Sequence, residues 1–333
     1  MRRDSMTFDK RTIYSGWDWD DILSSAVLAQ ALLRKGFKIF LEFPSPQELR
    51  NLIINKAYSV GISHKDGVRL INSTSLQYIT EKRLGLVLRY DDGGRPSTIM
   101  RFANVNTLTE VALEYVQTLN EYVDVPKQLL EDVAFMSSGR LDKLSRIGRI
   151  MHRALKMNYG NKEFRSIMYN FVFNAIATKS LKIPEALIRE AGKYDEAIKI
   201  ARKLLKEERY VTTDNIKVLV ISSKYDDELV RENISLLKPV AYDTLLKVCR
   251  TDGVAMLILE TGLGHTLRVC LNRRDISFVN IVKSIPREAS SKLIITMRGN
   301  HIIVKFRKPS ESTLNAVLDI ALSMARGVTP SRA

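Results

Sequence analysis

The spacing of apolar and polar positions changes its period twice along this 333-residue chain. Up to Val105, short apolar runs alternate with stretches in which apolar residues recur every three or four positions, which predicts strands and helices in turn. The expected strands are Thr12–Tyr14, Phe37–Phe43, Tyr58–Ile62 and Gly85–Tyr90, and the expected helices are Asp21–Lys35, Ser45–Lys56 and Ser73–Lys82. This order favours a parallel sheet with right-handed crossovers.

From Asn106 to Glu208 the period stays at three to four residues, which predicts helices alone. These helices are Thr107–Tyr122, Pro126–Phe135, Leu141–Lys156, Lys162–Ala177, Pro184–Ala191 and Tyr194–Glu207. A second strand-rich region follows, with strands expected at Ile216–Ser222, Val240–Tyr242, Ala255–Glu260, Leu267–Leu271, Lys292–Thr296 and His301–Phe306, and helices at Asp226–Leu237, Ile276–Ile285 and Ser312–Arg326. We therefore expect two α/β units joined by a helical block, divided into residues 1–135, 136–210 and 211–333.

The formal charge of +15 is concentrated in two segments of the chain. Residues 139–210 contain 17 Lys and Arg against 8 Asp and Glu, and residues 265–308 contain 10 against 2. Confined basic segments on a nearly neutral body indicate contact with a polyanion such as nucleic acid. A basic protein whose charged helices are merely solvated is the alternative.

Several classes of protein are excluded by what the sequence lacks. No apolar run approaches the length of a membrane span, no signal-peptide core follows Met1–Ser5, and no nucleotide-triphosphate motor signature occurs. Cys249 and Cys270 stand in apolar surroundings and are expected to be buried thiols, forming neither a disulfide nor a zinc site. We expect a cytoplasmic, nucleoid-associated protein without membrane contact.

The candidate chemistry lies in the turn Gly16-Trp17-Asp18-Trp19-Asp20-Asp21, between an expected strand and an expected helix. Two carboxylates two residues apart at such a turn are suited to hold Mg²⁺ or Mn²⁺. The same carboxylates could instead cap the helix and interact with its dipole. Trp17 and Trp19 could stack on nucleotide bases, although packing is the commoner use of at least one of them.

This turn resembles the first motif of the RecJ-like group of the DHH superfamily, which reads His-x-Asp-x-Asp-Gly-x-x-Ser-Ala. Asp18, Asp20 and Ser24 match that motif, whereas Gly16 stands at its histidine and Asp21 at its glycine. The resemblance implies an N-terminal α/β domain with metal motifs, a helical connection, and a smaller C-terminal domain that holds substrate. It covers most of the chain.

The other motifs of the family are degenerate in this chain. The Asp-His-His triplet corresponds to Asp91-Asp92-Gly93, and the second-motif aspartate is matched only by a displaced Asp66. The segment Met136-Ser137-Ser138-Gly139 stands where a further metal aspartate is expected. The Gly-Gly-Gly-His signature is reduced to Arg298-Gly299-Asn300-His301. A two-metal centre needs more carboxylates and imidazoles than these. We expect no catalysis and no cofactor, with at most one weak Mg²⁺ on Asp18, Asp20 and Asp91, and favour the capping role for Asp18 and Asp20.

In lacking these metal ligands, the chain resembles the non-nucleolytic branch of the family, whose members belong to archaeal and eukaryotic replicative helicases. That branch implies a scaffold in DNA replication whose partners are the GINS complex, the MCM helicase and DNA, single-stranded DNA in particular. One alternative is a weak Mn²⁺-dependent single-strand exonuclease or phosphodiesterase that uses Asp18, Asp20, Asp66 and Asp91. Another is a free-standing protein that binds single-stranded DNA.

Two groups of basic residues are candidate nucleic-acid contacts. Arg146, Arg149, Arg153 and Lys156 recur at three- and four-residue spacing on one helical face, downstream of Arg140 and Lys143. The second group consists of Arg273, Arg274, Arg298, His301, Lys305 and Arg307. A solvated face is the alternative for the first group, and a surface for an acidic partner is the alternative for the second. The histidines His64, His152, His265 and His301 are expected to be structural or solvent-exposed.

Overall fold

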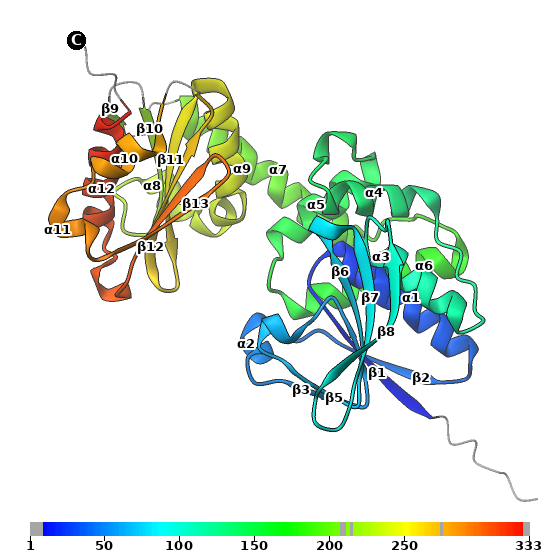
Figure 1. Cartoon of the computed structure of the whole chain (residues 1–333). Helices are drawn as coiled ribbons and strands as arrows, with labels where there is room; N and C mark the ends of the chain where they lie inside the picture. Colours follow the sequence, from blue (N-terminus) through cyan, green and yellow to red (C-terminus); the bar gives the residue numbers. More distant parts are fainter. Residues whose placement is uncertain (1–8, 207–210, 214–215, 274–275, 329–333) are drawn as a thin grey trace, which may run out of the picture. The chain divides into compact units, whose positions relative to one another are not determined.

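The computed structural model describes residues 9–206, 211–213, 216–273 and 276–328 (Figure 1). The chain divides into two compact units, Met1–Ala191 and Gly192–Ala333, and helix α7 (Glu185–Lys206) runs through the boundary. The expected fold class is confirmed: an N-terminal domain with a parallel sheet, helices in the middle of the chain, and a C-terminal sheet domain. None of the described helices is long and apolar enough to cross a membrane.

The sheet of the first unit has the order β2-β1-β4-β6-β7-β8. Its strands are β1 (Lys10–Ser15), β2 (Lys38–Glu42), β4 (Tyr58–Val60), β6 (Thr74–Ile79), β7 (Leu84–Tyr90) and β8 (Pro96–Ala103), while β3 (Ile53–Asn55) and β5 (Arg69–Ile71) form a separate parallel pair. The pairs among β2, β1, β4 and β6 are parallel, and β7 and β8 are antiparallel additions. Because parallel strands end at one edge, the turn after β1 meets the end of β4, where Gly16 N donates to Val60 O at 2.9 Å.

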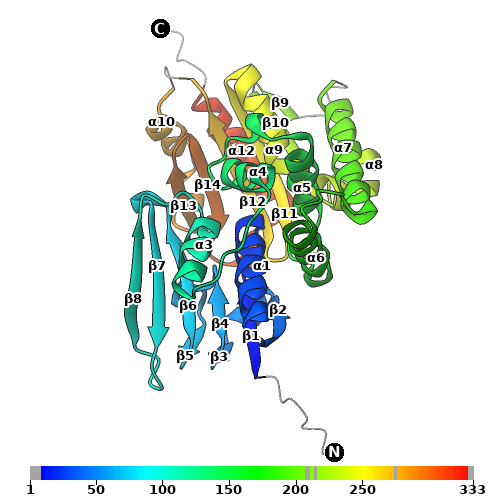
Figure 2. The same cartoon turned by 90° about the vertical axis from the view of Figure 1, so that its right-hand side faces the viewer.

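Helix α1 (Trp19–Arg34) is almost entirely buried and forms the centre of the first unit's core. The other helices are α2 (Pro46–Leu49), α3 (Leu108–Thr118), α4 (Lys127–Ser137), α5 (Arg146–Met157) and α6 (Lys162–Thr178), with single 3₁₀ turns at His64–Asp66, Thr80–Lys82 and Leu141–Lys143. Figure 2 shows α1 and α3 on one face of the sheet. Met151, Phe164 and Phe171 of the helical block join the same core, so α5 and α6 pack onto the first unit.

The second unit contains a sheet covered on both faces. Its order is β13-β14-β12-β11-β10-β9, with β9 (Val211–Thr213), β10 (Ile216–Ile221), β11 (Val254–Thr261), β12 (Gly264–Leu271), β13 (Leu293–Arg298) and β14 (His301–Phe306). Helices α8 (Glu228–Glu232) and α9 (Ile234–Asp252) connect the parallel strands β10 and β11; α10 (Phe278–Lys283), α11 (Arg287–Ser290), the 3₁₀ turn Pro309–Glu311 and α12 (Leu314–Arg326) complete the unit. Alternate residues serve two cores, Val218 facing one and Leu219 the other, which explains the continuous apolar run of β10.

Several expected elements differ from the structure, among them the expected helices Pro184–Ala191 and Tyr194–Glu207, which form the single helix α7. The segment expected as helix Ser73–Lys82 forms strand β6 and a 3₁₀ turn, because its Thr, Ile and Tyr residues pair with β4 and β7. Only Pro46–Leu49 of the expected helix Ser45–Lys56 is helical, and its end forms β3. The expected strand Val240–Tyr242 lies inside α9, which continues through Pro239. Strand β8 was not expected at all.

The two cysteines form a disulfide, which corrects the expectation of free thiols. Cys249 in α9 and Cys270 in β12 are linked across 21 residues of sequence and are both 1 % exposed. Their burial follows the sequence pattern, but their pairing depends on the packing of α9 against the sheet.

Candidate functional site

The acidic turn begins α1 and is built by reciprocal capping. Asp18 is the N-cap residue, and its Oδ1 accepts from Asp21 N at 3.0 Å. In return, Asp21 Oδ2 accepts from Asp18 N at 3.2 Å and from Trp17 N at 2.7 Å. This capping box satisfies backbone donors that a helix start otherwise leaves unpaired. The capping interpretation of Asp18 is therefore confirmed.

Asp20 anchors a second helix rather than its own. Its carboxylate accepts from Leu108 N and Thr109 N, both at 2.8 Å, from Thr109 Oγ1 at 2.7 Å, and from Ser137 Oγ at 3.4 Å. These contacts hold the first turn of α3 against α1. Asp20 is buried, with 6 % of its surface exposed. Burial and the nearby charge of Asp18 raise the pKa of Asp20 to about 6, although the donors from Thr109 and Leu108 act in the opposite direction.

Asp21 occupies space that two glycines leave open. A Cβ atom on Gly16 would lie 2.3 Å from Asp21 Oδ2, and one on Gly61 would lie 1.8 Å from Asp21 Oδ1. Side chains at positions 16 and 61 are thus incompatible with this carboxylate. Burial, together with the charge of Asp18, raises the pKa of Asp21 well above its usual value.

A cleft of about 750 Å³ in the first unit opens onto this acidic turn. Three basic side chains, Lys65, Arg83 and Arg140, line it together with Asp18, Asp20 and Asp21. The further lining residues are Gly61, Ser63, His64, Gln77, Tyr78, Ile79, Thr80, Tyr90, Asn106, Leu108, Ala134, Ser137 and Ser138. Ser137, from the segment where a metal aspartate was expected, presents a hydroxyl to Asp20. The cleft therefore combines acidic groups, basic groups and hydroxyls.

The other two acidic candidates are held elsewhere. Asp91 lies in the β7–β8 turn, where it accepts from Arg95 N at 2.7 Å. Since β7 is antiparallel to β6, with Arg89 opposite Thr74, Asp91 lies at the edge where β6 begins, not where β1 ends. Asp66 accepts from Ser63 N at 2.8 Å and from Ser63 Oγ at 3.2 Å. Neither residue lines the cleft.

The side chains of this acidic turn do not fit as ligands of a pair of divalent ions. Both oxygens of Asp20 and one oxygen of Asp21 already accept hydrogen bonds from backbone N–H groups, and Gly16 offers no imidazole. Among the described residues, no group of three His, Cys, Asp or Glu side chains is arranged to hold a metal ion. A two-metal centre needs several such ligands with unshared oxygen atoms.

The first basic group forms the outer face of α5. Arg146 and Arg149 are exposed, Arg153 and Lys156 are half-buried, and Gly148, Met151 and Ala154 are buried on the opposite side. The start of α5 is held by buried Asp132 of α4, which accepts from Ser145 N at 2.8 Å and Ser145 Oγ at 2.5 Å.

The second basic group is only partly brought together. In the β13–β14 ladder, Arg298 is opposite His301, and Lys305 lies four positions further along the same face of the sheet as His301. His301 Nε2 is 3.2 Å from Tyr242 Oη, and burial together with nearby Arg268 lowers the pKa of His301. Arg307 follows β14, and exposed Arg273 follows β12. Arg274 lies outside the described residues.

Two residues that no sequence pattern singles out, Arg165 and Tyr159, surround Trp17. The Arg165 guanidinium is fully buried, lies 4.6 Å from the Trp17 ring and 6.0 Å from the Tyr159 ring, and has Nε and Nη2 without a hydrogen-bond partner in the described part of the chain. Burial lowers the pKa of Arg165 to about 10, so the group remains charged at neutral pH. By contrast, Trp19 is a core residue that donates from Nε1 to Met151 O at 2.9 Å.

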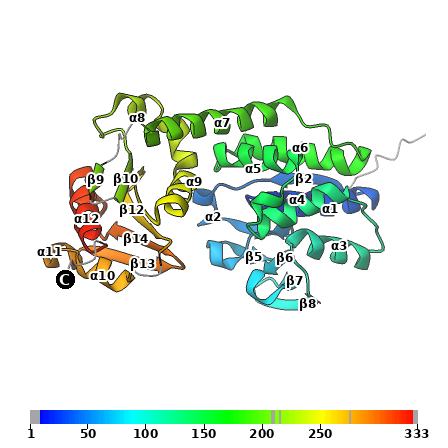
Figure 3. The ribbon, with the colours of Figure 1, turned by 90° about the horizontal axis from the view of Figure 1, so that it is seen from above.

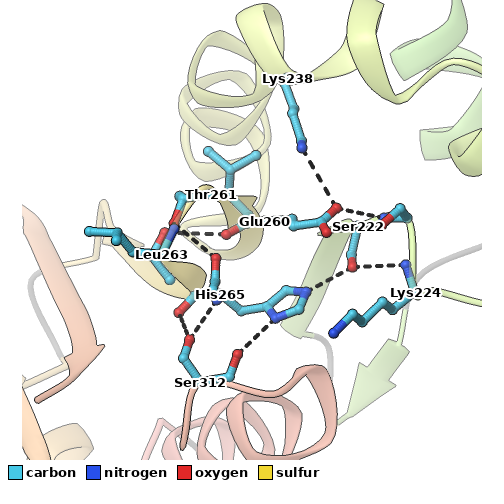
Figure 4. Close-up of polar contacts among 12 residues, drawn as sticks. Ser222, Lys224, Lys238, Glu260, Thr261, Leu263, His265 and Ser312 are labelled. Carbon is cyan, nitrogen blue, oxygen red and sulfur yellow. Dashed lines mark hydrogen bonds and ion pairs between the residues drawn. The ribbon is translucent and has the colours of Figure 1, made fainter. Parts of the chain in front are cut away.

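A buried serine–histidine pair in the second unit has the geometry of an activated nucleophile but not its access (Figure 4). His265 Nδ1 is 3.0 Å from the Ser312 carbonyl, so it carries the proton, and Nε2 accepts from Ser222 Oγ at 2.8 Å. Ser222 is fully buried and His265 is 3 % exposed. This pair therefore links β10, β12 and the segment before α12, as expected of a structural histidine.

Comparison with known proteins gives matches in three dimensions only. No family model matches the chain, and no curated protein matches it in sequence. The fold is similar to RecJ of Thermus thermophilus in complex with Mn²⁺, at 13 % identity and a TM-score of 0.47, over 95 % of this chain and 52 % of that one. The chain thus spans about half the length of that RecJ.

Two further solved structures match along nearly their whole length. One is the pGpG-specific phosphodiesterase PggH of Vibrio cholerae, at 9 % identity and a TM-score of 0.48, over 96 % of this chain and 98 % of that one. The other is CDC45 of Entamoeba histolytica, at 7 % identity and a TM-score of 0.42, over 96 % of this chain and 95 % of that one. All three matches are below 15 % identity and have TM-scores under 0.5. At these scores the function of the chain has to come from its own residues.

Proposed function

We propose that this chain is a diverged RecJ-like protein of the DHH superfamily that has no phosphodiesterase activity and serves as a scaffold in DNA replication. Its partners in this proposal are the GINS complex and the MCM helicase, and its basic surfaces contact DNA. The observation that carries the loss of chemistry is the use of Asp20. A carboxylate that accepts two backbone N–H groups and a hydroxyl of α3 has little capacity left for a cation.

The similarity of the chain to CDC45 is consistent with this role, and its similarity to PggH is equally consistent with phosphodiester hydrolysis. The chain's own residues favour the first. Asp91 and Asp66 do not line the cleft, and Ser137 faces Asp20 where a further carboxylate would be needed.

Calorimetry with Mn²⁺ and a nuclease assay test the absence of catalysis. We expect no tight Mn²⁺ binding and no cleavage of a labelled single strand by the purified chain. Asp18→Ala and Asp91→Ala serve as matched variants, because neither carboxylate anchors α3. Cleavage by the wild type that Asp18→Ala abolishes would contradict the proposal and support the phosphodiesterase.

Capture from the native cell tests the scaffold role. A tagged full-length chain is expected to co-purify with GINS and MCM subunits, and the complexes are expected to withstand nuclease treatment. Loss of both partners after nuclease digestion would contradict a scaffold and favour a free-standing DNA-binding protein.

A further inference from the structure

The second unit has a groove of about 380 Å³ between α11 and the start of α12. Figure 3 shows these two helices next to each other. The floor of the groove is apolar: Ile320 belongs to the core of the unit, and Phe306, at the end of β14, packs against that core. The other apolar lining residues are Pro286, Ala289 and Ala316. Pockets that bind ligands measure about 300–1,000 Å³, so this groove has room for side chains of a partner.

The rim of the groove is acidic. Glu288 of α11 and Asp319 of α12 are exposed, and half-buried Glu311 precedes α12. Among the described residues that line the groove, Lys292 alone is cationic, and its Nζ lies 3.9 Å from Glu311 Oε2. The carboxylates of Glu288 and Asp319, one on each helix, are therefore left without a cation from the lining.

This acidic rim stands in a basic part of the chain. Residues 265–308 contain 10 Lys and Arg against 2 Asp and Glu, and one of those two acids is Glu288. The neighbours of the groove in sequence, Arg287 and Lys308, do not line it. Because charges further apart than about 8 Å are largely screened at physiological salt, a bound group at the rim senses mainly the carboxylates. The groove thus favours a cationic ligand, although the chain as a whole is basic.

We infer that this groove is a docking site for a peptide segment of a partner protein, in which an apolar side chain fills the floor and flanking Lys or Arg residues pair with Glu288 and Asp319. Complementary charge of this kind selects a partner and fixes its register. A nucleic acid has the wrong charge for the rim, and a free polyamine has no bulky apolar group for the floor beside Phe306. The inference goes beyond the proposed function, because it involves neither DNA nor the identity of the replication partners.

Fluorescence anisotropy tests the inference with the full chain and a fluorescein-labelled peptide in which two lysines stand on each side of one phenylalanine. Two control peptides separate the two chemistries. Replacing the phenylalanine by alanine is expected to weaken binding about 10-fold, because the floor is left unfilled. Replacing the four lysines by glutamine is expected to weaken binding about 3- to 10-fold at low salt, because the rim loses its counter-charges.

Variants of the chain provide the second arm. Glu288→Gln with Asp319→Asn is expected to weaken binding about 3- to 10-fold at low salt and less at high salt. Ala316→Leu narrows the groove and is expected to weaken binding about 10-fold at every salt concentration. Glu228→Gln with Glu232→Gln removes the same charge from α8 and is expected to bind like the wild type. Since Glu288 and Asp319 are exposed, the rim variant is expected to melt at the wild-type temperature.

Failure of the wild type to bind the phenylalanine peptide overturns the inference, and so does binding that neither the rim variant nor Ala316→Leu weakens. Equal binding of the phenylalanine and alanine peptides, together with displacement of both by spermidine, overturns it in favour of a site for free polyamines. None of these results bears on the proposed replication role, which the Mn²⁺, nuclease and capture experiments test separately.

Discussion

The carboxylate of Asp21 and the missing side chain of Gly16 occupy one and the same space. A Cβ atom at position 16 would lie 2.3 Å from Asp21 Oδ2. The two positions are therefore sterically coupled: the carboxylate of Asp21 fits only because position 16 has no side chain.

This coupling predicts that the effect of Gly16→Ala on the free energy of unfolding depends on whether Asp21 is present. Gly16→Ala is expected to lower the free energy of unfolding by about 2 kcal/mol, because its methyl group overlaps Asp21. In an Asp21→Gly background the same change is expected to be neutral or to stabilise by up to about 1 kcal/mol, because alanine restricts the unfolded chain. Urea unfolding of the four proteins measures the cycle. Gly192→Ala, which meets nothing within 4 Å, is the control; equal costs in both backgrounds would rule out the overlap.

Asp20 predicts a pH dependence of stability. Its pKa of about 6 in the folded chain exceeds the usual value near 4, so the folded state holds the proton more tightly than the unfolded state does. The free energy of unfolding should therefore fall as pH rises from about 4 to 6, by on the order of 3 kcal/mol from this group. Asp20→Asn should remove that part of the slope. Unfolding curves of both proteins from pH 4 to 7 test this, and parallel profiles would contradict it.

The disulfide between Cys249 and Cys270 is expected to stabilise the second unit. A link across 21 residues restricts the unfolded chain by an amount worth about 3 kcal/mol. Cys249→Ala with Cys270→Ala should lower the stability by about this amount, and a reductant should act slowly on the native protein because both residues are buried. Intact mass without reductant, two hydrogens lighter than the reduced chain, verifies the bond. Two titratable thiols in the untreated protein would disprove it.

Asp132 is expected to control the start of α5. Asp132→Ala leaves both the N–H and the hydroxyl of Ser145 without their acceptor and should cost about 2–3 kcal/mol, whereas Ser145→Ala keeps the backbone contact with Asp132, removes the hydroxyl that caps Gly148 and donates to Asp132, and should cost about 1 kcal/mol. Thermal unfolding ranks the two variants. Hydrogen exchange of α5 should increase in Asp132→Ala, and protection at wild-type levels would show that α5 is held by other contacts.

The fold could be predicted where apolar residues recur at one constant spacing over a long segment. Most amphipathic helices of the middle block and most apolar strands of the second unit follow the sequence pattern, although the expected helices Pro184–Ala191 and Tyr194–Glu207 form the single helix α7. The pattern failed where two periods compete, as in Ser73–Lys82, whose Thr and Tyr residues pair into a strand. It also failed at Val240–Tyr242, an apolar run expected as a strand that lies inside α9, which continues through Pro239.

The candidate site could be located from the sequence, but only part of its bonding was foreseeable. Asp18 and Asp21 are three residues apart, so their capping box is a local property. The partners of Asp20 are 88 and 89 residues away, and no spacing rule reveals them. Arg165 and Tyr159 were missed for the same reason, since their relation to Trp17 depends on how α6 packs against α1.

The link from Asp20 to α3 joins two distant parts of the sequence at one junction. Because the carboxylate belongs to the first turn of α1 and accepts from the first turn of α3, a change at position 20 would leave backbone donors unpaired 88 residues further along the chain. The two helices therefore share a single starting point, and neither can be shifted along its axis without disturbing the other.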